Sequence, residues 1–320
     1  MMATVIDPRA WYIVINPASG AGRAARFAPR LAAALGRARV PFRCVESAAP
    51  SGARGEFSRA AAAGWRRLLA LGGDGTFNEL VNGLLDSGVP PRDCLVAAAA
   101  GGTGNDWSRA MEIPDDADRL AGCMARGAGR AADVGVAAGA DGRRSAFHNV
   151  AGAGVDAEVI RRTPRRGPRA AAYLAGLLAT LVRYRAPEFE LTVDGRELRG
   201  RFLLVLAAIG PRCGGGMRLA PGAVADDGWL DLLTVDPLSP AGALARLPKL
   251  FDGRLAGDPA FRVLRCREAT IRCARPCGVE LDGEPFGATP VTVTIMPGAL
   301  SALDCRPATR EATGSSRANP

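Results

Sequence analysis

The sequence of 320 residues predicts an α/β domain built on a parallel sheet, followed by an antiparallel β-sandwich. Up to about residue 125, apolar strand-like runs alternate with helical runs, which is typical of a parallel sheet with helices on both faces. Three of the strand-like runs end in glycine-rich turns. Beyond about residue 135, short strand-like runs with DG and PG turns indicate a second, largely antiparallel β domain.

The first domain is expected over residues 1–135. Its strands are predicted at 11–16, 41–47, 67–73 and 94–100, and its helices at 23–38, at 55–65, from residue 76 and from residue 105. Ligands of such sheets bind outside the carboxyl ends of the strands, and the three glycine turns fall at that edge. This edge is therefore the expected binding site.

The second domain is expected over residues 136–306, and the polar stretch 307–320 is expected to be a disordered tail. Only two runs in this half are predicted to be helical, 169–185 and 239–253. Strand-like runs are found at 147–159, 189–198, 201–210, 229–235, 261–273, 277–284 and 291–298.

Composition and charge narrow the class of protein. Hydrophobic residues make up 48% and charged residues 23%, as in a folded soluble protein. We expect no signal peptide, because the start lacks a basic segment followed by an apolar one. The longest apolar helical run, 170–182, is too short to span a bilayer. A net charge of +9 favours phosphate-rich partners, namely nucleotides, nucleic acid or an anionic membrane.

The eight cysteines form no paired C-x-x-C array, so we expect free thiols in a reducing cytoplasm rather than a zinc site. Aromatic residues are only 5%, and no stacking platform is visible, so we expect no nucleic-acid partner.

The stretch GGDGTFNELVNG, residues 72–83, places an acid inside a glycine turn that precedes a helix. Such a turn exposes backbone amides where phosphate binds readily. Asp74 is unfavourable beside a phosphate unless a cation joins them, so it implies Mg²⁺, a proton acceptor, or both; phosphoryl transfer needs both. Thr76 and Glu79 fit a capping box at the start of the helix.

The stretch LDGEP, residues 281–285, supplies a second pair of acids. Asp282 and Glu284 stand two apart, a spacing that keeps both carboxylates on one side of a strand. An ordinary DG hairpin turn is the alternative.

Six motifs in order resemble the diacylglycerol kinase catalytic fold, whose superfamily also contains sphingosine and ceramide kinases. They are NPASGAG (16–22), GGDGTFNELVNG (72–83), GGTGND (101–106), DVG (133–135), GGGMRLAPGAVADDGWLDL (214–232) and LDGEP (281–285). The resemblance covers nearly the whole chain and is nearest to the bacterial soluble lipid kinases. It implies an NAD kinase- or phosphofructokinase-like first domain and an ATP-dependent lipid kinase, most simply one that converts diacylglycerol to phosphatidic acid.

The resemblance also implies roles for individual residues. ATP would contact Asn16, Ser47, Gly72, Gly73, Asp74, Gly75, Thr76, Asn78, Thr103 and Asn105. Glu284 would accept the proton of the lipid hydroxyl with Asp282 assisting, although these two roles could be exchanged, and Asp133 would join a carboxylate–water network. A structural Mg²⁺ would bind the Asp227 side chain and the Val224 and Trp229 carbonyls. Asp226 could replace Asp227, and the segment could also be a simple acidic turn.

Other functions stay open at this point. An NAD kinase or sugar kinase shares the GGDGT turn, and an inactive nucleotide- or membrane-binding regulator is a third possibility. We expect a cytoplasmic protein that meets its lipid at an anionic membrane surface. The arginine-rich segment 161–185 either rests on that surface or packs on the β domain. A homodimer is a further expectation, and the lipid acceptor is left open between glycerolipid and sphingoid.

Overall fold

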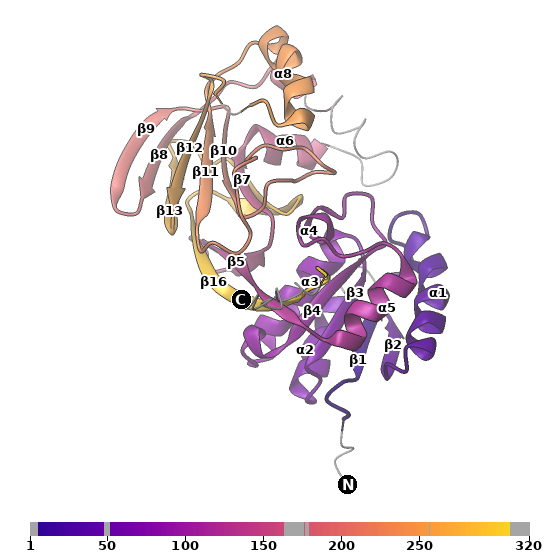
Figure 1. Ribbon diagram of the computed structural model, residues 1–320. Helices are drawn as coiled ribbons and strands as arrows, with labels where there is room; N and C mark the ends of the chain where they lie inside the picture. Colours follow the sequence, from indigo (N-terminus) through magenta and orange to yellow (C-terminus); the bar gives the residue numbers. More distant parts are fainter. Residues whose placement is uncertain (1–5, 48–51, 163–175, 177–178, 256, 308–320) are drawn as a thin grey trace, which may run out of the picture.

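The computed structural model describes residues 6–47, 52–162, 176, 179–255 and 257–307, arranged as an α/β domain and a β domain (Figure 1). The first domain is built on a parallel sheet in the order β2 (Phe42–Glu46), β1 (Trp11–Ile15), β3 (Arg67–Gly72) and β4 (Leu95–Ala100). Every residue of β1 is buried, as expected for a strand covered on both faces.

Helices connect these strands and cover the sheet. Helix α1 packs against α5, and α2 packs against α3. The bounds are α1 (Arg23–Arg37), α2 (Gly52–Ala62), α3 (Asp74–Asp86), α4 (Asp106–Ala110), α5 (Ala117–Arg126) and the 3-10 turn η1 (Pro91–Asp93).

The last strand, β16 (Val291–Leu303), belongs to both domains. Its first part pairs antiparallel with β13 (Glu268–Cys273), while Ser301 and Ala302 pair parallel with β4. It also runs antiparallel to the long strand β5 (Gly129–Gly139), with a register shift between Met296 and Leu300. One sheet of ten strands therefore passes from the α/β domain into the β domain, where β6 (Arg144–Phe147), β8 (Glu188–Val193) and β9 (Arg196–Arg201) complete it.

A second sheet of six antiparallel strands packs on the β-domain part of the first. Its order is β12 (Phe261–Cys266), β11 (Leu230–Val235), β10 (Leu204–Ala208), β7 (Val150–Gly154), β14 (Gly278–Leu281) and β15 (Glu284–Ala288). Phe147, Phe189 and Val293 of the first sheet share one apolar core with Val205 and Leu232 of the second. On the opposite face, α6 (Val155–Arg162) and α8 (Pro240–Asp252) add a smaller apolar core.

The predicted fold class, an α/β domain followed by an antiparallel β-sandwich, is confirmed. The predicted division at residue 135 falls inside β5, and the structure adds that β16 returns to the first domain. All but the first residue of the expected tail 307–320 and most of the arginine-rich segment lie outside the described residues.

Two local predictions were wrong. The run 147–159 was predicted as strand, but α6 begins at Val155. The run 261–273 contains two strands that belong to different sheets, because Arg267 separates β12 from β13. The predicted strand 291–298 is confirmed, and it continues to Leu303. Among the helices that the structure describes, none is long and apolar enough to cross a membrane.

Candidate active site

Three glycine turns meet at the carboxyl ends of β1, β3 and β4. A Cβ on Gly102 would lie 2.3 Å from the Cα of Gly73, and a Cβ on Gly20 would lie 2.1 Å from the carbonyl oxygen of Gly101. The Gly101 N–H donates to the Gly72 carbonyl at 2.8 Å. Since no side chain fits at these contacts, the glycines allow the three turns to form one surface, at the edge where the sequence predicted them.

The predicted nucleotide-binding residues lie on or beside these turns. Asn16 Nδ2 donates to Thr76 Oγ1 at 3.2 Å, which links the first turn to α3. Asn105 Oδ1 accepts the Gly102 N–H at 2.8 Å and orders the third turn. Thr103 is exposed in that turn. Ser47 follows β2, and its N–H donates to the Ile15 carbonyl at 2.9 Å.

Helix α3 begins at Asp74, and the predicted capping box is wrong. Gly73 occupies the N-cap position, and no side chain of the described residues caps the helix. Thr76 is buried and accepts its hydrogen bond from Asn16, while Glu79 Oε2 accepts the Arg54 N–H of α2 at 3.1 Å. The first amides of α3 are therefore available to an anion, and the packed glycine turns beside them fit a phosphate chain.

Asp74 lies beside a second acid, Asp106. Asp74 Oδ1 accepts the Trp107 N–H at 3.2 Å, while Asp106 Oδ2 accepts the Gly215 N–H at 2.7 Å. Asp106 is 2% exposed, and its Oδ1 has no hydrogen-bond partner in the described part of the chain. Burial, together with the charge of Asp74, raises the pKa of Asp106. Two carboxylates at a phosphate-binding edge form a donor set that suits Mg²⁺.

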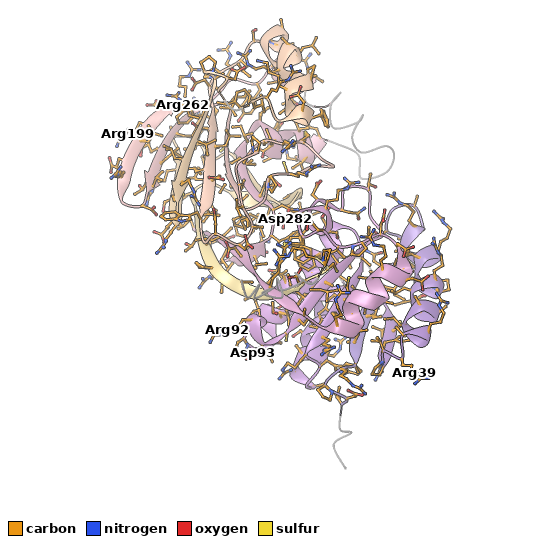
Figure 2. The ribbon with its side chains drawn as sticks, viewed as in Figure 1. Arg39, Arg92, Asp93, Arg199, Arg262 and Asp282 are labelled. Atoms are coloured by element: carbon orange, nitrogen blue, oxygen red, sulfur yellow. The ribbon has the colours of Figure 1, made fainter. Side chains whose placement is uncertain are left out.

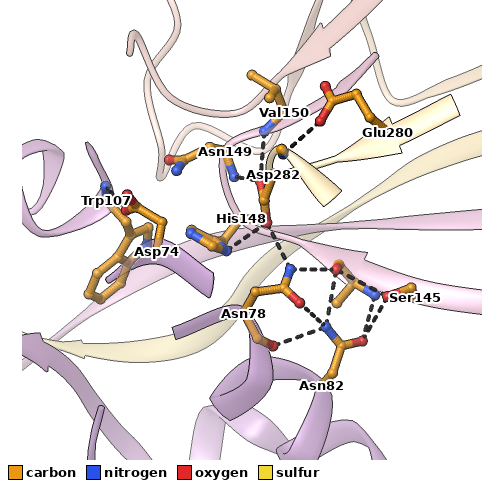
Figure 3. Close-up of polar contacts among 12 residues, drawn as sticks. Asp74, Asn78, Asn82, Trp107, Ser145, His148, Asn149, Val150, Glu280 and Asp282 are labelled. Atoms are coloured by element: carbon orange, nitrogen blue, oxygen red, sulfur yellow. Dashed lines mark hydrogen bonds and ion pairs between the residues drawn. The ribbon is translucent and has the colours of Figure 1, made fainter. Parts of the chain in front are cut away.

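The candidate acid Asp282 is enclosed by donors (Figure 3). Its Oδ1 accepts the Asn149 and Val150 N–H groups at 2.9 and 3.0 Å. Its Oδ2 accepts the His148 N–H at 2.9 Å and Asn78 Nδ2 at 2.8 Å, and His148 Nδ1 lies 2.7 Å away. Burial acts to raise the pKa of Asp282, but His148 and the backbone donors outweigh it, so the pKa is lowered.

His148 is fully buried beside this carboxylate. Its ring contacts Phe77 edge-on at 5.0 Å between centroids. Burial acts to lower the pKa of His148, but the charge of Asp282, and more weakly those of Asp74 and Asp106, raise it overall. His148 was not predicted to belong to the site. The one available signal was that the only histidine of the chain stands at the start of the predicted strand-like run 147–159.

The prediction that Asp282 and Glu284 share one side of a strand was wrong. Asp282 and Gly283 form the two-residue turn between β14 and β15, with φ angles of 50° and 84°, and Leu281 pairs with Glu284. Positive φ at both central positions is the Asp-Gly hairpin geometry, so the alternation of a strand does not extend through the turn. The Asp282 side chain is consequently buried, at 2% exposure, whereas Glu284 is exposed.

A cleft of about 270 Å³ lies between α3 and the β14–β15 hairpin. Figure 2 places Asp282 where the two domains meet. Glu284 and Asn78 line the cleft together with residues that the sequence analysis did not identify: Arg54, Arg143, Arg144, Ser145, Leu281, Pro285 and Phe286. Arg143 donates to the Phe286 carbonyl at 2.9 Å and lies over its ring. The acids at 282 and 284 therefore face the helix that starts at the glycine turn.

The predicted structural metal segment lies elsewhere. Asp227 Oδ1 accepts the Trp229 N–H at 3.1 Å, and Oδ2 is ion-paired with Arg265. Val224 is 48% exposed. Asp133 accepts N–H groups of Gly228 and Gly298, both at 2.7 Å, and so anchors this segment to β16 rather than to the acids at 282 and 284. A metal here would have to replace the Arg265 guanidinium, so this role stays a prediction.

Comparison with known proteins agrees with this geometry. Residues 10–137 match the diacylglycerol kinase catalytic domain, and residues 149–304 match the YegS C-terminal NAD kinase beta sandwich-like domain. A Pseudomonas fluorescens protein named "Probable lipid kinase YegS-like" is 32% identical over 244 residues, covering 75% of this chain and 78% of that protein. The chain belongs to the diacylglycerol kinase-like family of lipid kinases.

Other members of the lipid kinase family have similar coverage. A Bacillus subtilis diacylglycerol kinase is 29% identical over 228 residues, covering 70% of this chain and 72% of the relative. A solved diacylglycerol kinase from Bacillus anthracis superposes with a TM-score of 0.69 at 21% identity, covering 93% of this chain and 97% of the other. The resemblance inferred from the six motifs is thereby confirmed, and so is the shared fold.

Proposed function

We propose that this lipid kinase transfers the γ-phosphoryl group of ATP to a lipid hydroxyl, converting diacylglycerol to phosphatidic acid. The observation that carries the proposal is the hydrogen bond from Asn78 to Asp282, at 2.8 Å. It joins the helix that begins at the phosphate-binding turn to the turn that bears the acids, and Asn78 and Glu284 line one cleft. A donor site and an acceptor site on opposite sides of a cleft are what phosphoryl transfer needs.

The phosphate side is formed by the three glycine turns and the first amides of α3. Asn16 and Asn105 hold these turns in place through hydrogen bonds to Thr76 and to the Gly102 N–H. Asp74 would hold Mg²⁺, which when bound neutralises the triphosphate charge and orients the γ-phosphate.

On the acceptor side we assign the proton acceptor to Glu284 rather than to Asp282. Asp282 already accepts hydrogen bonds from four donors and lies 2.7 Å from His148 Nδ1, and its lowered pKa makes it a weak base, so it holds the turn. Glu284 is exposed on the cleft. In the transfer, the lipid oxygen bonds to the γ-phosphorus, the bond from that phosphorus to the β–γ bridging oxygen breaks, and the hydroxyl proton passes to Glu284.

We further propose that the acceptor is met at an anionic membrane surface. The net charge of +9 supports attraction to such a surface. On α8, at the end of the β domain away from the α/β domain (Figure 1), Leu244 and Phe251 are 54% and 52% exposed and lie seven residues apart on one helix face. Lys249 and Arg254 stand near Phe251 in sequence and are ion-paired with Asp258 and Asp252. A homodimer remains a prediction, which light scattering would test.

The test is phosphate transfer from radiolabelled ATP, read by thin-layer chromatography. Phosphatidylcholine vesicles would carry diacylglycerol, ceramide or sphingosine, and a separate reaction would contain NAD. We expect labelled phosphatidic acid from the wild type and none from Asp74→Asn. Asp93→Asn is the matched control, since Asp93 is exposed on the α/β domain far from the cleft (Figure 2). Near-normal transfer by Asp74→Asn, or transfer to NAD alone, would overturn the proposal.

A further inference from the structure

Two buried carboxyl groups lie directly behind the β14–β15 turn and have no part in the proposed transfer. Glu280 on β14 is 2% exposed, and Asp156 in the first turn of α6 is 6% exposed. Glu280 pairs across the sheet with Gly152 of β7. A Cβ on Gly152 would lie 1.9 Å from Asp156 Oδ2 and 2.8 Å from Glu280 Oε1. The missing side chain at position 152 therefore leaves the space in which the two carboxyl groups face each other.

A hydrogen bond between the facing carboxyl oxygens of Glu280 and Asp156 requires a proton on one of them. Glu280 Oε2 accepts the Gly283 N–H at 2.6 Å, and Asp156 Oδ1 accepts the Ala157 N–H at 2.7 Å. Asp156 Oδ2 receives no N–H or O–H donor from the described residues. Ionised carboxylates only accept hydrogen bonds, so one carboxyl must be protonated for the facing oxygens to bond. Two contacting carboxylates away from water cannot both be ionised.

In the part of the chain that the structure describes, the groups that face the pair are acidic or neutral. Asp282 lies two residues from Glu280, and its negative charge opposes ionisation of Glu280. The other titratable groups that face the pair are the Cys213 thiol, near both acids, and Tyr184 and Cys277, near Asp156. Burial raises the pKa of all three, so they are neutral. Among the described side chains, no arginine or lysine is ion-paired with either acid. Burial raises the pKa of Asp156 to about 6 and that of Glu280 well above its usual range.

We propose that Glu280 and Asp156 share one proton, and that this protonated pair makes Glu280 a positioning residue for the β14–β15 turn. The inference rests on the proposed function, because the turn is expected to present Glu284 to the lipid hydroxyl. Glu280 holds the N–H of Gly283, the residue between Asp282 and Glu284. Loss of the shared proton places two negative charges side by side, which pushes the Glu280 carboxylate away and releases that N–H.

Two substitutions separate positioning from simple packing. Glu280→Gln keeps an oxygen for the Gly283 N–H and an amide donor for Asp156, but it does not titrate. Glu280→Ala removes both contacts. We expect Glu280→Gln to keep wild-type turnover at pH 7 and to lose activity at a higher pH than the wild type. We expect Glu280→Ala to lose about a hundredfold in kcat with an unchanged KM for ATP, because the turn moves while the phosphate site does not. Glu197→Gln on the exposed face of β9 is the matched control.

A second measurement does not depend on the kinase assignment. Infrared spectroscopy at neutral pH should show a buried protonated carboxyl in the wild type and in Glu197→Gln, and this band should be missing from Glu280→Gln. An identical band in Glu280→Gln would overturn the proposal. So would a loss of activity at alkaline pH that occurs at the same pH in Glu280→Gln and in the wild type. If the wild type transfers no phosphate to lipid, the proposed function fails, and the infrared result still decides whether the proton is shared. If Glu280→Ala does not fold, Glu280→Gln carries the test.

Discussion

The side-chain amide of Asn78 and the carboxylate of Asp282 are joined by a hydrogen bond of 2.8 Å across 204 residues of sequence. Asn78 lies one turn after Asp74 on α3, and Asp282 opens the β14–β15 turn. The same amide donates to the Ala146 carbonyl of β6 at 3.1 Å. One side chain therefore sets the distance between the glycine turn, the β domain and the acids of the cleft (Figure 3).

Replacing Asn78 by aspartate should weaken both stability and turnover. The change removes two donated hydrogen bonds and sets a carboxylate against the buried Asp282, so we expect a loss of about 1–3 kcal/mol in the free energy of unfolding. Urea unfolding measures it. Asn78→Ala removes the same bonds without adding charge and should cost less. Equal stability of the wild type and the aspartate variant would contradict this role.

The ion pair of His148 and Asp282 should make stability depend on pH in a defined window. In the folded protein the pKa of His148 is raised above 6.5. Its contribution to the free energy of unfolding is therefore complete below pH 6.5, and it is lost as the pH rises through the pKa of the folded protein. In the folded protein the pKa of Asp282 is lowered below 3.8. Its contribution to the free energy of unfolding is therefore complete above pH 3.8, and it is lost as the pH falls through the pKa of the folded protein. The pair is thus fully stabilising between these limits.

We therefore expect His148→Leu to differ most from the wild type between about pH 4 and 6.5, and less at alkaline pH. Unfolding by urea at a series of pH values measures the difference. The titration of Glu280 and Asp156 is common to both proteins and cancels in the subtraction. A difference that stays constant from pH 5 to pH 9 would mean that the imidazole contributes only packing.

Substitution of Gly102 should separate the glycine turns. A Cβ at this position lies 2.3 Å from the Gly73 Cα and 3.0 Å from Asn105 Oδ1, so Gly102→Ala forces the second and third turns apart. We expect a loss of about 1–3 kcal/mol in stability and a large rise in the Kd for ATP, measured by calorimetry. Gly122→Ala on α5 is the control, since a Cβ there meets no atom within 4 Å. Unchanged ATP binding by Gly102→Ala would contradict the predicted site.

The segment around Asp227 should respond to Mg²⁺ if it holds the predicted structural ion. Replacing Asp227 by asparagine should then raise the Mg²⁺ concentration needed for half-maximal activity. Asp226→Asn is the matched control, because Asp226 lies 3.9 Å from Arg130 instead. A titration of activity against Mg²⁺ compares the two. A larger effect of Asp226→Asn would assign the ion to Asp226 instead. No effect of either variant would mean that Asp227 serves only to pair with Arg265 and to accept the Trp229 N–H.

Local patterns predicted the architecture and the meeting of the three glycine turns at one edge of the sheet. The alternation of strands and helices placed the glycine turns at one edge, because the carboxyl ends of parallel strands lie together. Both the one-sided strand and the DG hairpin were open for the acidic motif. The hairpin proved right, because Asp282 and Gly283 adopt positive φ.

Features that depend on distant pairing were not predictable. His148 shows no periodic signal, and its partner Asp282 is 134 residues away. Helix α6 has eight residues and follows a buried strand, so its apolar positions resembled a continuation of that strand. The run at 291–298 indicated only a strand. Nothing local in it shows that its continuation past Gly298 pairs with β4, some two hundred residues earlier.

The course of β16 through both domains limits how the kinase can move. Ser301 and Ala302 pair with β4 of the α/β domain, while Val291 to Thr294 pair with β13 of the β domain. The two domains are therefore joined by a shared strand. A fragment that stops near residue 137 would expose the edge of β4 as an open, aggregation-prone strand. Any opening of the cleft must therefore bend a continuous sheet, whose pairing is irregular at the register shift between Met296 and Leu300.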